Sequence, residues 1–150
     1  MKTGICFFFT LYCLFQIHAV EAQSVLGKWK TYDIFDKNRE EAIVEILQDK
    51  DGLYIKIIEI IPEEHKNDLC TNCSDSRKDQ PILGMVILKG TKLQDNVWQG
   101  AEILNAKNGN EYGCNFSLES PDLLRVRGFV GYPIFGKTLY WTRINERDFR

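Results

Sequence analysis

Two cysteines separated by two residues are the most chemically distinctive feature of this sequence. Cys70 and Cys73 lie in a polar stretch that has no helical pattern behind it. Reactive pairs with this spacing usually sit at the N-terminus of a helix, which lowers the pKa of the thiol. Asp68 and Asp75 flank the pair here and disfavour the thiolate. We therefore predict a structural disulfide and keep a redox-active pair as the alternative.

A zinc site is a second chemistry that the residue types allow. Its ligands would be His65, Cys70, Cys73 and Cys114. The signal is weak because the sequence has a single C-x-x-C, and Cys114 lies in an alternating segment typical of a small buried residue. We predict that Cys114 stays unpaired and that the protein holds no metal or cofactor. No nucleophile elbow, phosphate loop or paired-carboxylate motif occurs, so we predict no enzymatic activity.

Arg125 and Arg127 are the best candidates for binding an anion. They lie two residues apart on one predicted strand and therefore share a face. If the face of Leu124 and Val126 lines the interior, both arginines are solvated. If the opposite face points inward, they could hold the carboxylate of a ligand, and Glu102 could be their partner. Together with two aromatic residues, the predicted ligand-binding set is Trp98, Glu102, Tyr112, Arg125 and Arg127.

Eight alternating apolar segments must position these side chains. We predict strands over residues 26–33, 41–48, 53–61, 82–89, 97–104, 111–119, 123–130 and 136–144, with one long loop over 63–81. Short links between consecutive strands favour an all-β fold, an eight-stranded antiparallel up-and-down β-barrel, because closure removes exposed sheet edges. A Greek-key sandwich is the alternative.

The first 22 residues have the pattern of a secretory signal peptide. Lys2 precedes a long apolar run, and Val-Glu-Ala at 20–22 offers a cleavage site before Gln23. We predict a cleaved signal over residues 1–22 and a single barrel domain over 23–150, either periplasmic or secreted. A membrane anchor is the alternative, but the run is short for the hydrocarbon core. No transmembrane segment is expected after cleavage.

Composition and charge narrow the classes of partner. The chain is 44% hydrophobic and 27% charged, which is typical of a folded globular protein. Its 19 Lys and Arg residues nearly balance 21 Asp and Glu residues, for a net charge of -2. Such a balance lacks the basic footprint of a nucleic-acid-binding protein, so no nucleic-acid partner is predicted.

Short motifs at the two ends of the predicted barrel form a matched pair. Gly-Lys-Trp at 27–29 opens the first strand, and Trp-Thr-Arg at 141–143 lies in the last. This arrangement resembles the lipocalin and calycin pattern. The resemblance implies that Gly27, Trp29 and Arg143 close one end of the barrel, with the guanidinium stacked on the indole.

A series of further motifs falls in a fixed order between these ends. They are Cys-Thr-Asn-Cys at 70–73, Gln-Pro-Ile-Leu-Gly at 80–84, Trp-Gln-Gly-Ala-Glu-Ile-Leu at 98–104, Asn-Gly-Asn-Glu-Tyr at 108–112 and Leu-Arg-Val-Arg-Gly-Phe-Val-Gly at 124–131. The series resembles the bacterial secreted family catalogued as domain of unknown function 2147. That family often has Gly-Gly where this chain has Gly100-Ala101. The resemblance implies a lipocalin-like barrel exported from bacterial cells, and no reaction.

These observations together predict a binding protein. We expect an exported, non-enzymatic barrel that binds a small ligand, hydrophobic in part and able to carry negative charge. The alternative is an interaction module whose barrel is filled by side chains and whose surface contacts an envelope protein or a glycan.

Overall fold

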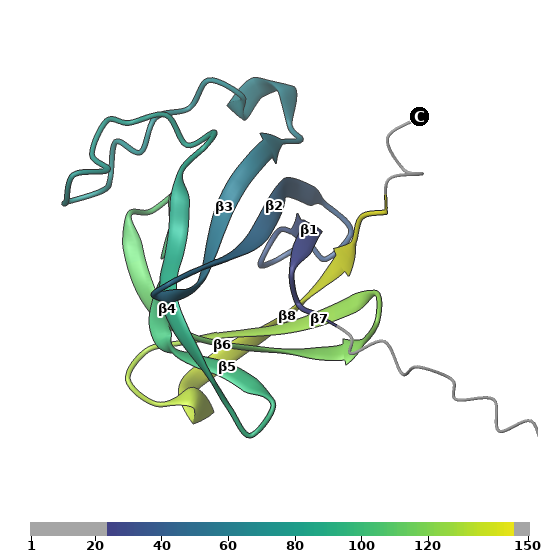
Figure 1. Cartoon of the computed structure of the whole chain (residues 1–150). Coiled ribbons are helices and arrows are strands. Elements are labelled where there is room, and N and C mark those ends of the chain that lie inside the picture. Colours follow the sequence, from purple (N-terminus) through teal and green to yellow (C-terminus); the bar gives the residue numbers. More distant parts are fainter. Residues whose placement is uncertain (1–23, 146–150) are drawn as a thin grey trace, which may run out of the picture.

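The chain folds into a closed barrel of eight antiparallel strands (Figure 1). A computed structural model describes residues 24–145, so the predicted signal peptide lies outside the described residues. The strands are β1 (Gly27–Tyr32), β2 (Glu40–Asp49), β3 (Gly52–Ile60), β4 (Val86–Gln94), β5 (Val97–Asn105), β6 (Asn110–Ser120), β7 (Leu123–Phe129) and β8 (Gly136–Arg143). Each strand pairs with the next, and β1 pairs with β8 to close the barrel. The predicted up-and-down barrel is confirmed.

Seven of the eight strands begin and end within one residue of their predicted bounds. The fourth was predicted over 82–89 but runs from Val86 to Gln94. Ile82 and Gly84 belong to the preceding loop: the Ile82 N–H donates to the Asp68 carbonyl within that loop, and the Gly84 N–H donates to the Ile57 carbonyl of β3. An apolar residue that packs on the core from a loop carries the same sequence signal as one in a strand.

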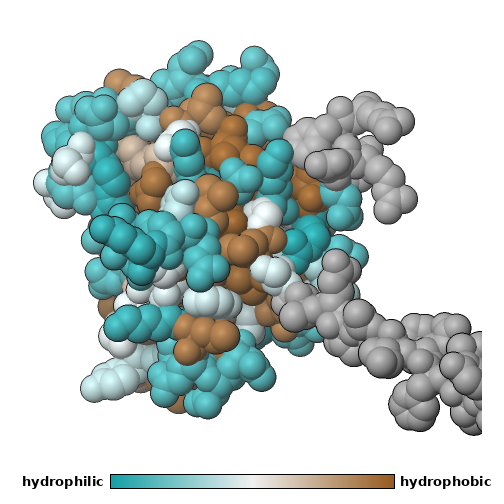
Figure 2. Space-filling view, viewed as in Figure 1, coloured by the Kyte–Doolittle hydropathy of each residue, from teal (hydrophilic) through white to brown (hydrophobic). Residues whose placement is uncertain are grey.

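Apolar side chains fill the interior of the barrel. The largest fully buried ones are Trp29, Phe116, Ile46, Leu53, Ile55, Leu124 and Val44. They alternate with outward-facing residues along each strand, as the period of two requires. Thr91 is the buried polar residue among residues 24–145, and its hydroxyl has no hydrogen-bond partner there. On the outside, apolar side chains form a broken band among polar ones (Figure 2).

The connections divide between the two ends of the barrel. Residues 33–39, 61–85, 106–109 and 130–135 all join strands at one end, which we call the loop end. Tight turns at 50–51, 95–96 and 121–122 lie at the other, the turn end. The loop end also carries the two short 3-10 helices, η1 (Glu63–His65) and η2 (Pro133–Phe135). Within residues 24–145 no helix has the length and hydropathy needed to cross a membrane.

Candidate functional site

Trp29 and Arg143 form a compact contact at the turn end. The centre of the Arg143 guanidinium lies 4.1 Å from the centroid of the Trp29 ring, and the indole N–H donates to the Val25 carbonyl at 2.9 Å. The guanidinium donates hydrogen bonds to three backbone carbonyls, those of Ser24 (2.6 Å), Pro121 (2.7 Å) and Leu26 (2.9 Å). Its hydrogen bonds all go to backbone carbonyls, and the guanidinium also lies 4.0 Å from the Asp122 carboxylate, so its role is to hold β1, β8 and the turn at 121–122 together.

Burial along β7 decides which way its two arginines point. Leu124 and Val126 are buried, and Val126 pairs with buried Phe116 on β6. Arg125 and Arg127 alternate with them and therefore lie on the outer face, opposite Ser117 and Asn115. The structure thus adopts the solvated alternative. The inward alternative is wrong because the apolar face of β7 is the one that gains most from burial.

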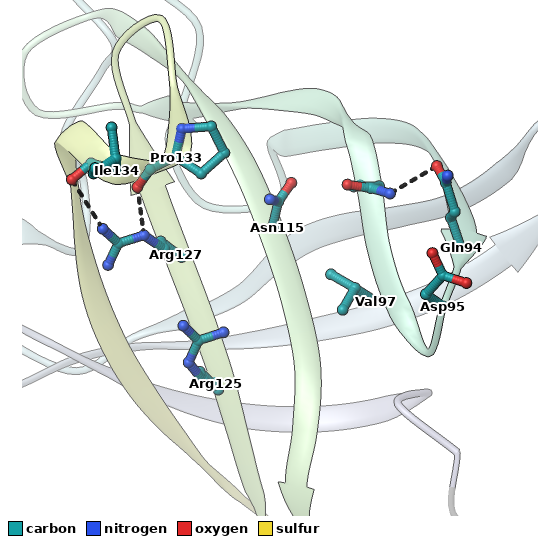
Figure 3. A pocket seen from close by; sticks show the side chains of 9 residues that line it. Gln94, Asp95, Val97, Asn115, Arg125, Arg127, Pro133 and Ile134 are labelled. Atoms are coloured by element: carbon teal, nitrogen blue, oxygen red, sulfur yellow. Dashed lines mark hydrogen bonds between the residues drawn. The ribbon is translucent and has the colours of Figure 1, made fainter.

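Arg127 is committed to the protein itself. Its Nε donates to the Pro133 carbonyl at 2.6 Å, its Nη1 to the Thr138 hydroxyl at 2.8 Å, and its Nη2 to the Ile134 carbonyl at 3.3 Å. Figure 3 shows the side chain reaching toward the backbone of this connection. Arg127 is therefore a positioning residue that fixes the connection between β7 and β8.

Arg125 lies next to Arg127 in an open groove on the outer face of β5, β6 and β7 (Figure 3). Its guanidinium has no hydrogen bond or ion pair with any residue that the structure describes. The groove has a volume of about 510 Å³. It is lined by Gln94, Asp95, Val97, Gln99, Asn115, Arg125, Arg127, Pro133 and Ile134. A free cation, several amides and apolar walls make this groove suited to an anion with an apolar part.

The other three predicted ligand residues lie elsewhere. Trp98 faces the interior, where its ring stacks on Phe116 with centroids 6.4 Å apart. Tyr112 shares the inner-face parity of Cys114 and receives a hydrogen bond from the Asn108 side chain at 3.1 Å. Glu102 is exposed on the outer face, outside the groove.

A β-bulge explains why Trp98 and Glu102 separate. The two residues are four apart, so a regular strand would place both on one face. The register shifts between Trp98 and Ala101, where Gly100 has φ of 85° and is the extra residue. Ala101 then pairs with Cys114 on the inner face, and Glu102 pairs with Gly113 on the outer face. The five predicted ligand residues therefore do not form one lining: they divide between the groove, the interior and the open surface.

The cysteine pair forms the predicted disulfide. Cys70 and Cys73 are joined, with Cα atoms 5.4 Å apart, and their residues are 0% and 3% exposed. The Cys70 sulfur lies 3.4 Å from the Ala106 carbonyl, and the Asn72 side chain donates to the Lys107 carbonyl at 2.9 Å. The bridge thus fastens the long β3–β4 loop onto the turn between β5 and β6. A buried bridge suits this structural role, because redox-active pairs are accessible.

The four residues of the zinc alternative do not come together. The sulfurs of Cys70 and Cys73 are bonded to each other, and Cys114 is buried inside the barrel. The exposed His65 ring instead contacts the Asp68 carboxylate at 2.8 Å. No group of three metal-binding side chains is found among residues 24–145. Burial raises the pKa of the Cys114 thiol to about 12, which leaves it protonated and unreactive.

Comparison with known proteins places the chain in a family. A family model described as "Uncharacterized protein conserved in bacteria (DUF2147)" matches residues 27–143. The chain belongs to the DUF2147 family. The match runs from the first residue of β1 to the last residue of β8, so it covers the whole barrel. No curated protein matches this DUF2147 sequence.

A solved structure has a fold similar to this barrel. Protein HP1028 from the human pathogen Helicobacter pylori, described as belonging to the lipocalin family, superposes with a TM-score of 0.72. It is 18% identical, and the similarity covers 83% of this chain and 86% of that chain. At this identity the likeness shows a shared lipocalin-like fold.

Sequence analysis missed most of the groove in this DUF2147 chain. The missed residues are Gln94, Asp95, Val97, Gln99, Asn115, Pro133 and Ile134. They come from three strands and two connections, which the pairing of β4, β5, β6 and β7 brings together. The alternation of inward and outward side chains along β6 places Asn115 on the outer face. This alternation does not indicate which residues of the neighbouring strands lie beside it.

Proposed function

We propose that this protein is an exported, non-enzymatic binding protein whose ligand is a small, partly apolar anion held in the groove at Arg125. The observation that carries the proposal is a guanidinium that has no partner among residues 24–145, in a groove with apolar walls. A guanidinium offers a carboxylate two parallel hydrogen bonds, which add both affinity and orientation. Val97 and Ile134 provide apolar surface for the rest of the ligand.

The groove supports this proposal better than the barrel interior does. Trp29, Phe116 and Leu124 occupy the interior and are almost fully buried. Neither arginine of β7 reaches that space, so an anion there would lose its hydration without gaining one of these cations. The outer groove supplies the cation at the surface, where a ligand keeps part of its hydration.

Asp95 restricts the charge of the ligand. This carboxylate lines the groove on the side of the β4–β5 turn, away from β7 (Figure 3). It would repel a second negative group and attract a hydrogen-bond donor or an ammonium group. The preferred ligand therefore carries one acidic group, placed at Arg125.

Export and the absence of catalysis belong to the same proposal. A disulfide persists in oxidising compartments outside the cytosol, which agrees with the signal-like pattern of residues 1–22. The Cys114 thiol is buried and protonated, so it is a poor nucleophile. We assign the periplasm or the extracellular space as the location.

Calorimetric titration of octanoate, with octanamide as its neutral counterpart, tests the groove. Octanoate should bind the parent chain, and Arg125→Gln should weaken it by about tenfold or more, because a charge-assisted pair is lost. Octanamide should bind both proteins equally. Lys50→Gln is the matched control, since it removes one positive charge from an exposed turn far from β7. Equal octanoate affinity in Arg125→Gln, or no octanoate binding to the parent chain, would refute the proposal.

The packed interior also favours a second candidate, an interaction module that contacts an envelope protein or a glycan. The long β3–β4 loop would make the contact, because the disulfide and the β5–β6 turn hold it in one shape. Deletion of residues 63–80 should abolish recovery of the partner while the β-rich circular dichroism spectrum persists. Recovery that survives the deletion would exclude the loop.

A further inference from the structure

Four large apolar side chains are exposed side by side in the connection between β7 and β8. We call residues 130–135 the β7–β8 knuckle. Val130, Tyr132, Ile134 and Phe135 are each between 68% and 77% exposed. The knuckle extends from the barrel wall at the loop end (Figure 1). An exposed apolar cluster of this density in so short a segment is typical of a surface that contacts a partner or a membrane.

The knuckle is held in this exposed arrangement. Arg127 donates to the carbonyls of Pro133 and Ile134, and the N–H of Tyr132 and that of Phe135 close turns within the knuckle at 2.9 Å each. The Phe129 ring covers Gly113 on the outer face, where a Cβ would overlap it. This network keeps the backbone ordered while the apolar side chains point away from it.

The chain segment that contains the knuckle carries only positive charge. Residues 123–142, which include β7, the knuckle and most of β8, contain three cations and no Asp or Glu: Arg125, Arg127 and Lys137. Arg125 has no protein partner among the described residues. This local excess of positive charge contrasts with the net charge of -2 of the whole chain. The segment is therefore complementary to an anionic surface.

A second apolar tip accompanies the first. Phe35, in the β1–β2 loop, is 89% exposed, and the Lys137 ammonium lies 4.8 Å from the centroid of its ring. Lys137 also donates to the Ile34 carbonyl, so it connects this loop to the start of β8. Both tips belong to the loop end, and each combines aromatic side chains with a nearby cation. Aromatic and basic residues are the types that settle in the headgroup region of a bilayer.

We propose that the β7–β8 knuckle inserts its apolar side chains into the surface of an anionic lipid bilayer. The projecting apolar tip enters the headgroup boundary, and Arg125, together with Lys137 at the start of β8, faces the lipid phosphates. A protein partner is a less suitable occupant, because this tip lacks the concave apolar groove that receives a helix. Ile134 and Arg125 also line the groove, so the test of this inference uses Tyr132 and Phe135, which do not line it.

Co-sedimentation with vesicles tests the insertion. The full chain should bind vesicles of phosphatidylcholine mixed with phosphatidylglycerol, and bind pure phosphatidylcholine vesicles much less. Tyr132→Ser combined with Phe135→Ser should reduce binding to the mixed vesicles by about tenfold, because two inserted apolar side chains are lost. Leu93→Ser is the matched control, since Leu93 is 55% exposed at the turn end. All variants share residues 1–22, so binding through that segment is common to them.

A local reporter gives a second reading that does not depend on total binding. Tryptophan introduced by Phe135→Trp should be quenched by brominated lipid in the mixed vesicles more strongly than tryptophan introduced by Leu93→Trp. Equal quenching at the two positions would overturn the proposal. So would undiminished sedimentation of the double variant, or binding to pure phosphatidylcholine that equals binding to the mixture. Octanoate titration of the same double variant should be unchanged, which separates this inference from the groove.

Discussion

The carbonyl oxygen of Asn72 occupies the space that a side chain at position 109 would need. An ideal Cβ built on Gly109 would overlap that carbonyl, and the Gly109 backbone has φ of 73°. The disulfide-bonded loop therefore docks on the β5–β6 turn because residue 109 is glycine. This contact joins two segments that lie more than thirty residues apart in the chain.

Gly109→Ala should destabilise the protein more than Gly84→Ala does. Both glycines have positive φ, but Gly84 has no atom within 4 Å of the Cβ position. Conformational strain alone predicts a loss of about 1 kcal/mol for Gly84→Ala, and the added overlap predicts about 2 to 3 kcal/mol for Gly109→Ala. Urea unfolding measures both losses, and limited proteolysis of residues 61–85 should accelerate only in Gly109→Ala. Equal losses would show that the loop docks independently of this contact.

Arg143→Lys should weaken the contact between Trp29 and Arg143 at the turn end. Lysine keeps the positive charge but cannot stack a planar group on Trp29 while donating to three carbonyls. We expect a loss of about 1 to 2 kcal/mol in the free energy of unfolding. Arg125→Lys is the control and should stay within about 0.5 kcal/mol, because Arg125 contacts no protein partner in the described region. A loss in Arg143→Lys no larger than in the control would contradict the role given to the guanidinium.

Cys114 should resist alkylation until the barrel unfolds. Burial raises the pKa of its thiol to about 12, so raising the pH through the ordinary thiol range does not produce the thiolate in the folded protein. Iodoacetamide treatment followed by mass spectrometry of the Cys114 peptide should show labelling at least about a thousandfold slower in buffer than in urea. Rapid labelling in buffer would mean that the interior opens locally.

Asp33 should make stability depend on pH through the β1–β2 loop. Its carboxylate accepts the N–H groups of Phe35 at 2.8 Å and Asp36 at 2.9 Å, and these bonds hold its pKa well below the usual range. A lowered folded-state pKa stabilises the protein at pH values above the unfolded pKa of about 3.9, and this contribution is lost as the pH falls further.

Thermal melts of Asp33→Asn against the parent chain therefore test this dependence. The difference in melting temperature should be largest near neutral pH and should shrink as the pH falls below about 4. Glu119→Gln, which removes an exposed carboxylate at the end of β6, should show no such trend. A difference for Asp33→Asn that stays constant across the titration would refute the assignment.

Strand positions were predictable because a strand with one buried face has apolar and polar residues in alternation. The strand β6 is the clearest example. The alternation through Cys114 and Phe116 correctly predicted which of its residues are buried. The bulge at Gly100 was missed: an isolated glycine inside a strand suggests a bulge but does not fix one, and the extra residue reverses the face of every residue after it. Glu102, which was expected to lie on the same face as Trp98, therefore lies on the outer face. The groove at Arg125 was missed for the same reason: its members come together only through register.

Closure through β1 and β8 places the start of the first strand beside the end of the last. Trp29 and Arg143 are direct neighbours across the sheet, so β1 begins and β8 ends at the same place, the turn end. A short linker could join these ends, and new termini could open at the exposed Asp95-Asn96 turn. Such a circular permutant would preserve all eight strands in their cyclic order, since a closed barrel has no intrinsic first strand.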